Sequence, residues 1–399
     1  MIKKKFVTDV ILNIIASLLL TSILQIIVLP VISARVYQDT FGEILTLQGI
    51  SNAIGVMFGA SLNNILLIKA NSYDNQSLTA TFSRLFRSSI IYATILSFPL
   101  LLFFGKEQGV VIALLMIVYT IGILIRSYLT VYYRLNLEYK KILLHVIITS
   151  LGYLLGIVIF FINDEWISIY LIGELFSVLY LFYTIRPKFL IRQKDGIFFQ
   201  IRKDFSNFFI SSMLTNVLLY LDRLLINPIL GASDVAVFFA ASVVGKLIGI
   251  VMQPLSGVIL SYISVDITEK PSKVFKYSLG ISSGIGILFF SGAYFATPFL
   301  LEVLYPDLFL EALPLYVLCN LIAVLNMIST IIQPLSLKFC PTYWQARIQI
   351  IYFICFFTLS LTFLYFYGLY GFIIGNIVSQ ILRLIVIIFV TNYYTQEEK

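Results

Sequence analysis

The sequence predicts an all-α polytopic membrane protein with twelve transmembrane helices, arranged as two six-helix lobes. Hydrophobic residues make up 60% of the 399 residues, charged residues make up 12%, and the mean hydropathy is +0.97. A soluble domain needs roughly a quarter of its residues to be charged, so this composition excludes a soluble fold. Apolar runs of about 20 residues, the length that crosses a hydrocarbon core, recur along the whole chain.

Twelve runs have the length and composition of a membrane span. The first is too long for the hydrophobic region of a signal peptide and ends without a small-residue cleavage site, so we expect a retained helix. The predicted spans are 8–31, 44–69, 88–104, 109–131, 142–162, 166–185, 207–229, 235–262, 277–298, 310–335, 348–367 and 370–392.

Basic residues concentrate in every second connection between these spans. The mid-chain connection alone holds six lysines and arginines, whereas the connections of the opposite side hold Arg35 and Lys106 and are otherwise acidic. Because cytoplasmic connections are enriched in lysine and arginine, both termini are predicted to be cytoplasmic. The net charge of +7 is therefore a topogenic signal, and we expect no nucleic-acid partner.

The mid-chain connection also suggests a division of the chain. Residues 187–206 alternate basic and aromatic side chains, as an amphipathic segment at the cytoplasmic headgroups does. The predicted domains are an N-terminal lobe 1–186, this linker 187–206 and a C-terminal lobe 207–399. The sequence IGELFS at 172–177 resembles IGNIVS at 374–379, as expected of two parallel repeats.

The sequence contains no pattern typical of a catalytic or metal centre. It lacks a nucleophile–histidine–acid set, a phosphate-binding glycine loop and a cluster of metal ligands. A single histidine cannot build a metal site, and the three cysteines lie in or beside apolar spans, where they act as apolar fillers. We therefore expect a protein that is not an enzyme and that needs no cofactor or metal.

Ionisable residues inside the spans are the informative ones, because each costs at least about 2.5 kcal/mol at the bilayer centre and must face protein or water. Cations outnumber acids among them, so an aqueous lumen lined by these residues would attract an anionic head group. The set consists of Arg126, Glu174, Asp222, Arg223, Lys246 and Arg383.

Lys246 is the sharpest candidate in this set. It lies about eleven residues into the eighth span, near the membrane midplane, and its own helix offers no acidic partner. The structural alternative is that these charges form interhelical ion pairs, or that long side chains such as Arg126 and Arg383 reach the membrane surface. Adjacent residues do not share a helix face, so Asp222 and Arg223 are predicted to meet different neighbours.

Several segments in order resemble a known family. They are ISARVY at 32–37 with FGE at 41–43, YLDRLLI at 220–226 followed by LG at 230–231 and VAVF at 235–238, LYP at 304–306, ALPL at 312–315 and GLYG at 368–371. Together they resemble the Wzx-type polysaccharide flippases, the polysaccharide transporter branch of the multidrug/oligosaccharidyl-lipid/polysaccharide exporter superfamily. Ala34, Tyr37-Gln38 and Ala236 depart from the family pattern, which weakens the match mainly at the first loop.

The resemblance implies a MATE-like V-shaped pair of lobes that works by alternating access. The implied cargo is an undecaprenyl-diphosphate-linked oligosaccharide, flipped across the bacterial inner membrane for O-antigen or capsular polysaccharide assembly. The implied partners are membrane lipids, a polysaccharide polymerase and a chain-length regulator. The motif match also adds Arg35, at the outer end of the first span, to the substrate-binding candidates, with pairing to Asp39 or Glu43 as the alternative.

Three other functions are open to a chain of this kind. A MATE-like cation-coupled multidrug antiporter would have a similar fold, but it needs buried carboxylates, and Glu174 and Asp222 are the two available. A polysaccharide polymerase would carry a large outer loop with paired catalytic groups, whereas the predicted outer loops are short. A purely structural scaffold would have little use for a lysine at the midplane.

Overall fold

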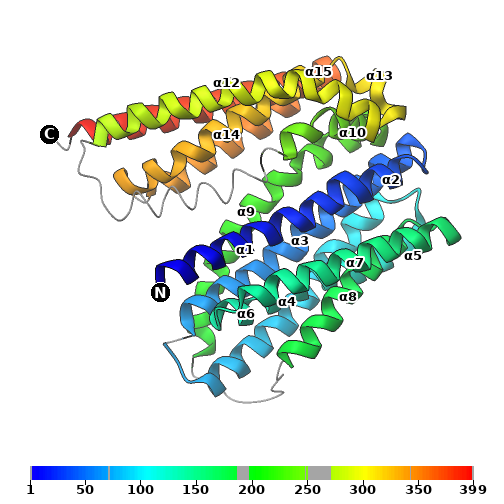
Figure 1. The fold of residues 1–399 in the computed structure, drawn as a ribbon, viewed down its shortest axis with the longest axis vertical. Helices are drawn as coiled ribbons and strands as arrows, with labels where there is room; N and C mark the ends of the chain where they lie inside the picture. Colours follow the sequence, from blue (N-terminus) through cyan, green and yellow to red (C-terminus); the bar gives the residue numbers. More distant parts are fainter. Residues whose placement is uncertain are drawn as a thin grey trace. The chain divides into compact units, whose positions relative to one another are not determined.

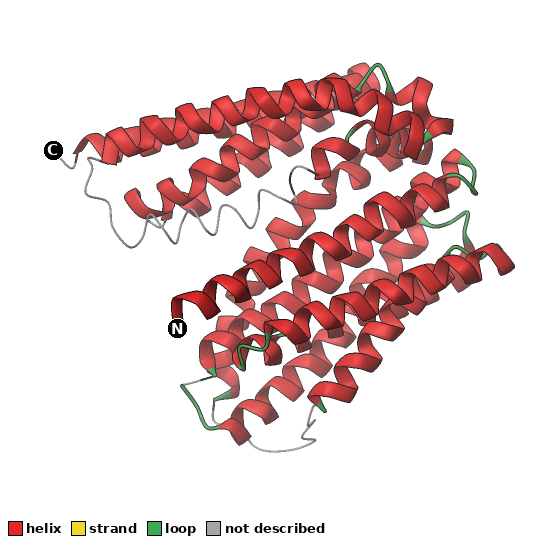
Figure 2. Cartoon of the chain, in the orientation of Figure 1, coloured by secondary structure: helices red, strands yellow, loops and turns green. Residues whose placement is uncertain are grey.

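The computed structural model describes residues 2–70, 72–186, 197–247, 249, 271–341 and 343–397. Within these residues the chain consists of helices joined by short loops, as Figure 2 shows. The helices form two compact units. Unit 1 contains residues 1–35 and 40–224, and unit 2 contains residues 36–39 and 225–399.

Unit 1 begins with a span made of three consecutive helical segments, of which the middle one is a π-helix. Its helices can be followed in Figure 1. They are α1 (Ile2–Ser22), η1 (Ile23–Val28), α2 (Leu29–Ser33), α3 (Gln38–Lys69), α4 (Asn75–Phe104), α5 (Gly109–Leu129), α6 (Val131–Leu135), α7 (Tyr139–Asn163), α8 (Ile167–Ile185) and the first part of α9 (Phe198–Leu230).

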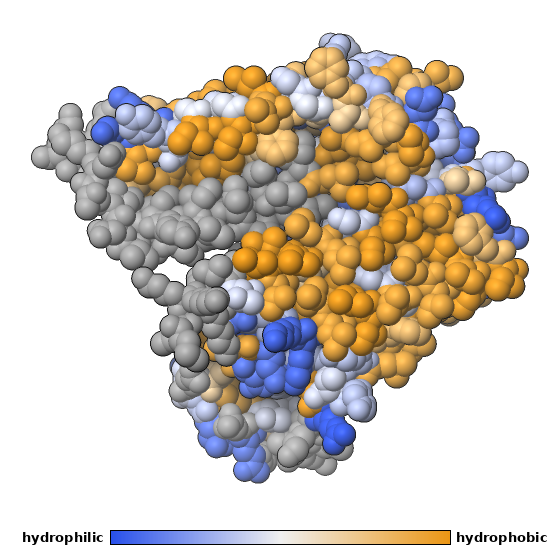
Figure 3. Space-filling view, in the orientation of Figure 1, coloured by the Kyte–Doolittle hydropathy of each residue, from blue (hydrophilic) through white to orange (hydrophobic). Residues whose placement is uncertain are grey.

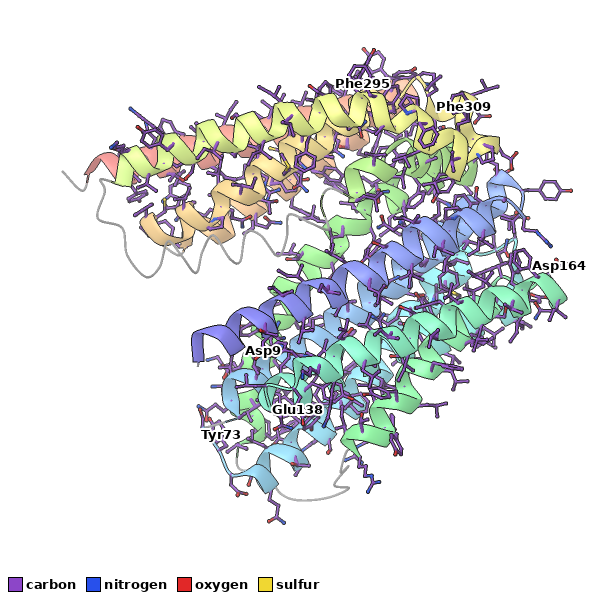
Figure 4. All side chains as sticks on the ribbon, viewed as in Figure 1. Asp9, Tyr73, Glu138, Asp164, Phe295 and Phe309 are labelled. Carbon is purple, nitrogen blue, oxygen red and sulfur yellow. The ribbon has the colours of Figure 1, made fainter. Side chains whose placement is uncertain are left out.

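Side-chain contacts show which ends of these helices lie together. At one end, Arg35 after α2 lies 3.7 Å from Asp164 after α7. At the other end, Lys69 of α3 forms a 2.8 Å ion pair with Asp204 of α9. In Figure 4, Tyr73 and Glu138 lie at the end of unit 1 opposite Asp164. Successive long helices of unit 1 therefore run antiparallel, as repeated membrane crossing requires.

The outer surface of unit 1 is apolar along the middle of its helices. On α7, Leu151, Leu155 and Ile162 are exposed, while Tyr153 and Phe160 are buried. Figure 3 shows hydrophobic residues over the middle of this unit and hydrophilic residues toward its ends. Water would not tolerate such an exposed face, whereas lipid chains would cover it.

In the described part of unit 2, six further helical elements follow the end of α9. They are α10 (Ala232–Ala241), α12 (Pro271–Leu304), η2 (Pro306–Leu308) with α13 (Phe309–Ala312), α14 (Tyr316–Phe339) and α15 (Tyr343–Glu397). Phe275 of α12, Ile332 of α14 and Ile387 of α15 belong to one buried apolar cluster. α9 contains Pro228, and the boundary between the units falls between Leu224 and Leu225 of this helix.

α15 is a helical hairpin of two arms that meet at Gly368. This glycine has φ +60°, a value that favours a residue without a Cβ. The two arms pack antiparallel, because Gln380 Nε2 donates to the Tyr352 hydroxyl at 2.8 Å and Trp344 Nε1 donates to the Tyr394 hydroxyl at 3.1 Å. The predicted turn between the last two spans, at 367–370, is confirmed.

The chain is a polytopic helical membrane protein, as predicted. Ten of the described helices are long and apolar enough to cross a membrane, and one of them, α15, comprises two arms. The described residues thus account for eleven of the twelve predicted spans. The eighth span, 235–262, starts with α10 and helical residues 243–247, and its remainder falls outside the described residues. Of the predicted linker, 187–196 also lies outside them, whereas 198–206 form the first turns of α9.

Gly371→Ala is expected to destabilise the α15 hairpin, because an added Cβ would overlap the Phe363 carbonyl oxygen of the facing arm. Overpacking of this kind costs about 1–3 kcal/mol and should lower the melting temperature of the purified protein. Gly292→Ala in α12 is the matched control, since its Cβ would meet no heavy atom within 4 Å. Equal melting temperatures for both variants would contradict the close approach of the two arms.

Candidate functional site

A buried ion pair lies at the centre of unit 1, between α5 and α8. Arg126 Nη2 lies 3.0 Å from Glu174 Oε1, and Arg126 Nε donates to Glu174 Oε2 at 3.1 Å. The two side chains are 17% and 4% exposed. Gly122, one turn before Arg126, allows this approach, because a Cβ there would lie 2.9 Å from the Cβ of Glu174. The pair is bidentate, the strongest geometry for a guanidinium with a carboxylate.

Tyrosines from neighbouring helices surround this pair. Tyr153 of α7 donates its hydroxyl hydrogen bond to Glu174 Oε1 at 3.0 Å. The hydroxyl of Tyr119 interacts with Asn52 of α3 and with Tyr153, and its ring packs on Tyr170 at 5.1 Å between centroids. Tyr119, Tyr153 and Tyr170 are all buried. Both side-chain oxygens of Glu174 are thus engaged, by Arg126 and Tyr153.

Arg223 makes a second polar contact within unit 1. Its Nη1 donates to the Leu45 carbonyl oxygen and, at 3.4 Å, to Gln48 Oε1 of α3. Gly49 provides the space, because a Cβ there would lie 3.2 Å from Arg223 Cδ. The half-buried Asp222 accepts a hydrogen bond from the backbone N–H of Arg223 at 2.8 Å. Through these hydrogen bonds, Arg223 holds α9 against α3.

Arg35 lies at one end of unit 1, outside the buried cluster. Its guanidinium stacks on the Phe161 ring at 4.4 Å and lies 3.7 Å from Asp164, which is 84% exposed. Asp39 and Glu43 were the structural alternative considered from the sequence, whereas the acid that lies near Arg35 within unit 1 is Asp164. Glu43 is buried and accepts a hydrogen bond from Gln108 Nε2 at 2.9 Å instead.

Lys246 lies in unit 2, in the helical residues that follow α10. Its Nζ is 4.3 Å from the ring centroid of Phe239 and 5.6 Å from that of Phe238, which is cation–π geometry. The neighbouring Gly245 faces α14, where an added Cβ would meet Ala323 at 2.5 Å and the Asn320 amide oxygen at 3.8 Å. The aromatic faces lower the cost of keeping an ammonium group away from bulk water.

Arg383 of unit 2 is buried, and it lies among neutral groups. Nη1 donates to Asn326 Oδ1 at 3.1 Å and Nη2 donates to Gln333 Oε1 at 3.4 Å, both on α14. Its guanidinium stacks on the Tyr352 ring at 4.8 Å, and the residue is 9% exposed. Arg383 is therefore enclosed by amides of α14 and an aromatic ring.

The structure thus distributes the predicted residues over distinct places. Arg126 and Glu174 form one pair, Arg223 lies against α3, Arg35 lies at an end of unit 1, and Lys246 and Arg383 belong to separate clusters of unit 2. Sequence reasoning missed their neutral partners. The sequence could have indicated Asn326 and Gln333 as a pair, because their spacing of seven residues puts them on one face of a helix. The tyrosines near Glu174 give no such signal, because they look like ordinary core aromatics.

No family model matches the sequence, and no curated protein matches it. Solved structures do match the fold. One is titled an inward-facing conformation of a multidrug resistance MATE family transporter of the MOP superfamily, with TM-score 0.71, 14% identity, and 96% of this chain and 100% of that chain covered. Another is the lipid II flippase MurJ in an inward closed conformation, with TM-score 0.72, 15% identity, and coverage of 97% and 86%. The chain shares their fold. At this identity the likeness concerns the fold alone.

Proposed function

We propose that the protein is a flippase that moves an undecaprenyl-diphosphate-linked oligosaccharide across the bacterial inner membrane by alternating access, for O-antigen or capsular polysaccharide assembly. The observation that carries this proposal is the balance of the buried charges. Glu174 is fully engaged by Arg126 and Tyr153, whereas Arg383 is held by neutral amides and an aromatic ring. A protein interior of this kind favours an anionic cargo.

The fold supports transport of some kind. The solved structures that match include MATE transporters and the lipid II flippase MurJ, none of which is described as an enzyme. The MurJ match covers 86% of MurJ, in line with a chain of fewer spans. The Wzx-type motifs at 32–43 and 220–241 favour a related lipid-linked oligosaccharide over lipid II itself. A polysaccharide polymerase and a chain-length regulator are the partners proposed with this cargo.

A MATE-like multidrug antiporter is the second candidate, because MATE structures match almost the whole chain. Such an antiporter needs an available carboxylate to bind an organic cation or a coupling ion. In unit 1 the buried carboxylate of Glu174 already accepts from Arg126 and Tyr153. Its charge is therefore compensated before any cation arrives, which favours the flippase.

The transport test uses the purified protein in liposomes. Vesicles would contain an undecaprenyl-diphosphate oligosaccharide with a fluorescent sugar, and an impermeant quencher would report how much lies in the outer leaflet. We expect the protein to render the inner-leaflet pool accessible, whereas the same liposomes should not exchange ethidium. Ethidium transport without oligosaccharide flipping would establish the antiporter instead.

The proposed orientation puts both termini in the cytoplasm, and cysteine labelling tests it. Four exposed positions serve: Lys106 and Asp164 in the connections proposed to be external, and Lys140 and Lys273 near those proposed to be cytoplasmic. An impermeant maleimide added to whole spheroplasts should label the first two cysteines and spare the last two. The opposite pattern would invert the proposed topology.

A further inference from the structure

A polar face on α14 includes both amide partners of Arg383. Asn326, Thr330 and Gln333 lie at intervals of four and three residues, so they share one face of this helix. Asn326 is exposed, and Thr330 and Gln333 are half-buried. Lipid chains would be a poor environment for the exposed amide of Asn326 in a membrane helix, so this face belongs next to water or polar groups.

Arg383 lies directly beneath this face. It bonds to Asn326 and Gln333 through its two terminal nitrogens, at 3.1 and 3.4 Å, which is long for bonds from a guanidinium. Among the described residues, no carboxylate lies within 4.0 Å of Arg383. Its Nε and the amide oxygens of Gln380 and Asn376, earlier on the same arm of α15, are buried without a hydrogen-bond partner in the described chain. The charge of Arg383 is thus solvated weakly by the protein.

Unit 1 contains a buried arginine whose charge is compensated by a carboxylate, the pair of Arg126 and Glu174. The matching segments 172–177 and 374–379 place Glu174 and Asn376 at equivalent positions. Both follow a glycine that packs against the preceding helix of its hairpin: a Cβ on Gly173 would meet Tyr153 at 2.5 Å, and one on Gly375 would meet the Leu359 carbonyl at 2.8 Å. Unit 1 therefore supplies a carboxylate where unit 2 supplies an amide, and its buried arginine is neutralised while Arg383 is not.

We propose that Arg383, Asn326 and Gln333 form a binding site for a phosphoryl anion, namely the diphosphate group of the cargo. This assignment rests on the proposed function and names the residues that contact the charged part of that cargo. A phosphoryl oxygen is a stronger acceptor than an amide oxygen, since it forms charge-assisted and bidentate bonds with a guanidinium. The anion displaces the two neutral acceptors from Arg383, and their side-chain amides then become available to donate to the remaining phosphoryl oxygens.

The test measures anion binding directly, with inorganic pyrophosphate as the probe and thermal unfolding of the purified protein as the readout. Pyrophosphate should raise the melting temperature of the wild type, and Arg383→Gln should weaken its affinity about tenfold or more. Gln380→Glu is the sharper variant, because it puts a carboxylate three residues before Arg383, on the same face of the helix. It should leave the unliganded melting temperature equal or higher and abolish the pyrophosphate effect. Lys140→Gln, on an exposed cation of α7, should retain that effect.

A second experiment identifies the source of the phosphoryl group. Nanodiscs of zwitterionic lipid would contain undecaprenyl diphosphate or, as the control, undecaprenol. Stabilisation by undecaprenyl diphosphate that is lost in Gln380→Glu supports the lipid head group, while a response to pyrophosphate alone overturns that part of the proposal. Unchanged pyrophosphate binding in both Arg383→Gln and Gln380→Glu overturns the site itself. If binding depends on Arg383 but liposomes show no flipping, the site stands and the proposed function falls.

Discussion

Glu174→Gln should destabilise the protein by about 3–5 kcal/mol, the usual cost of removing one partner from a buried ion pair. The substitution keeps the size of the side chain but leaves the Arg126 guanidinium enclosed without a carboxylate. The loss should appear as a lower melting temperature in detergent and a lower yield of folded protein. This is the largest stability effect that the structure predicts for a single isosteric change.

Two further variants show whether the pair or the individual groups matter. Tyr153→Phe removes one hydrogen bond to Glu174 and should cost about 1 kcal/mol. The double variant Arg126→Met/Glu174→Gln removes the stranded charge and should recover much of the stability that Glu174→Gln loses. A Glu174→Gln protein that melts with the wild type would show that the ion pair does not hold α5 to α8.

Lys246→Met should abolish polysaccharide export while the protein still inserts at normal abundance. Methionine retains the apolar stem but removes the charge that rests on the Phe239 ring at 4.3 Å. Under the proposed function, Lys246 would contact the diphosphate of the cargo, and an ammonium group contacts phosphate well without fixed geometry. The measurement is surface polysaccharide in cells that depend on the variant, with membrane abundance determined in parallel.

Charge and shape can be separated at the same position. Lys246→Arg keeps the charge and should retain part of the export activity, although the planar guanidinium packs differently on Phe239. Lys140→Met removes an exposed lysine on α7 and serves as the control that should export normally. Full export by Lys246→Met would falsify a role for this charge in moving the cargo.

The helices were predictable and their partners were not, for separate physical reasons. A span must be apolar for about 20 residues and must form its backbone hydrogen bonds within its own helix. The composition of the sequence therefore predicts helices such as α7 and α12. Contacts between spans depend on rotation and depth, which hydropathy does not encode. Arg126 and Glu174 lie on different spans and meet, because a helical side chain leans toward the N-terminus of its helix and arginine is long.

The same limit applies to the candidate site. The cation excess was visible in the sequence, because a charge in a span is rare enough to be noticed. That Arg383 contacts Asn326 and Gln333 required the structure, since amides in membrane helices also serve ordinary helix packing. Arg35 shows the same limit, because its nearest acids in sequence are on its own connection, while Asp164 lies far along the chain and close in space.

α9 carries the chain from unit 1 to unit 2 without a loop, and its proline sets the mechanical properties of that passage. Pro228 has no backbone N–H, so the carbonyl oxygen four residues earlier, on Leu224, loses its helical hydrogen bond. Leu224 is also the last residue of unit 1. The missing hydrogen bond therefore lies at the boundary between the two units, and we expect α9 to bend there more easily than elsewhere. Pro228→Ala would restore this hydrogen bond and make α9 stiffer at the boundary. It should therefore slow any transport cycle in which the two units move relative to each other.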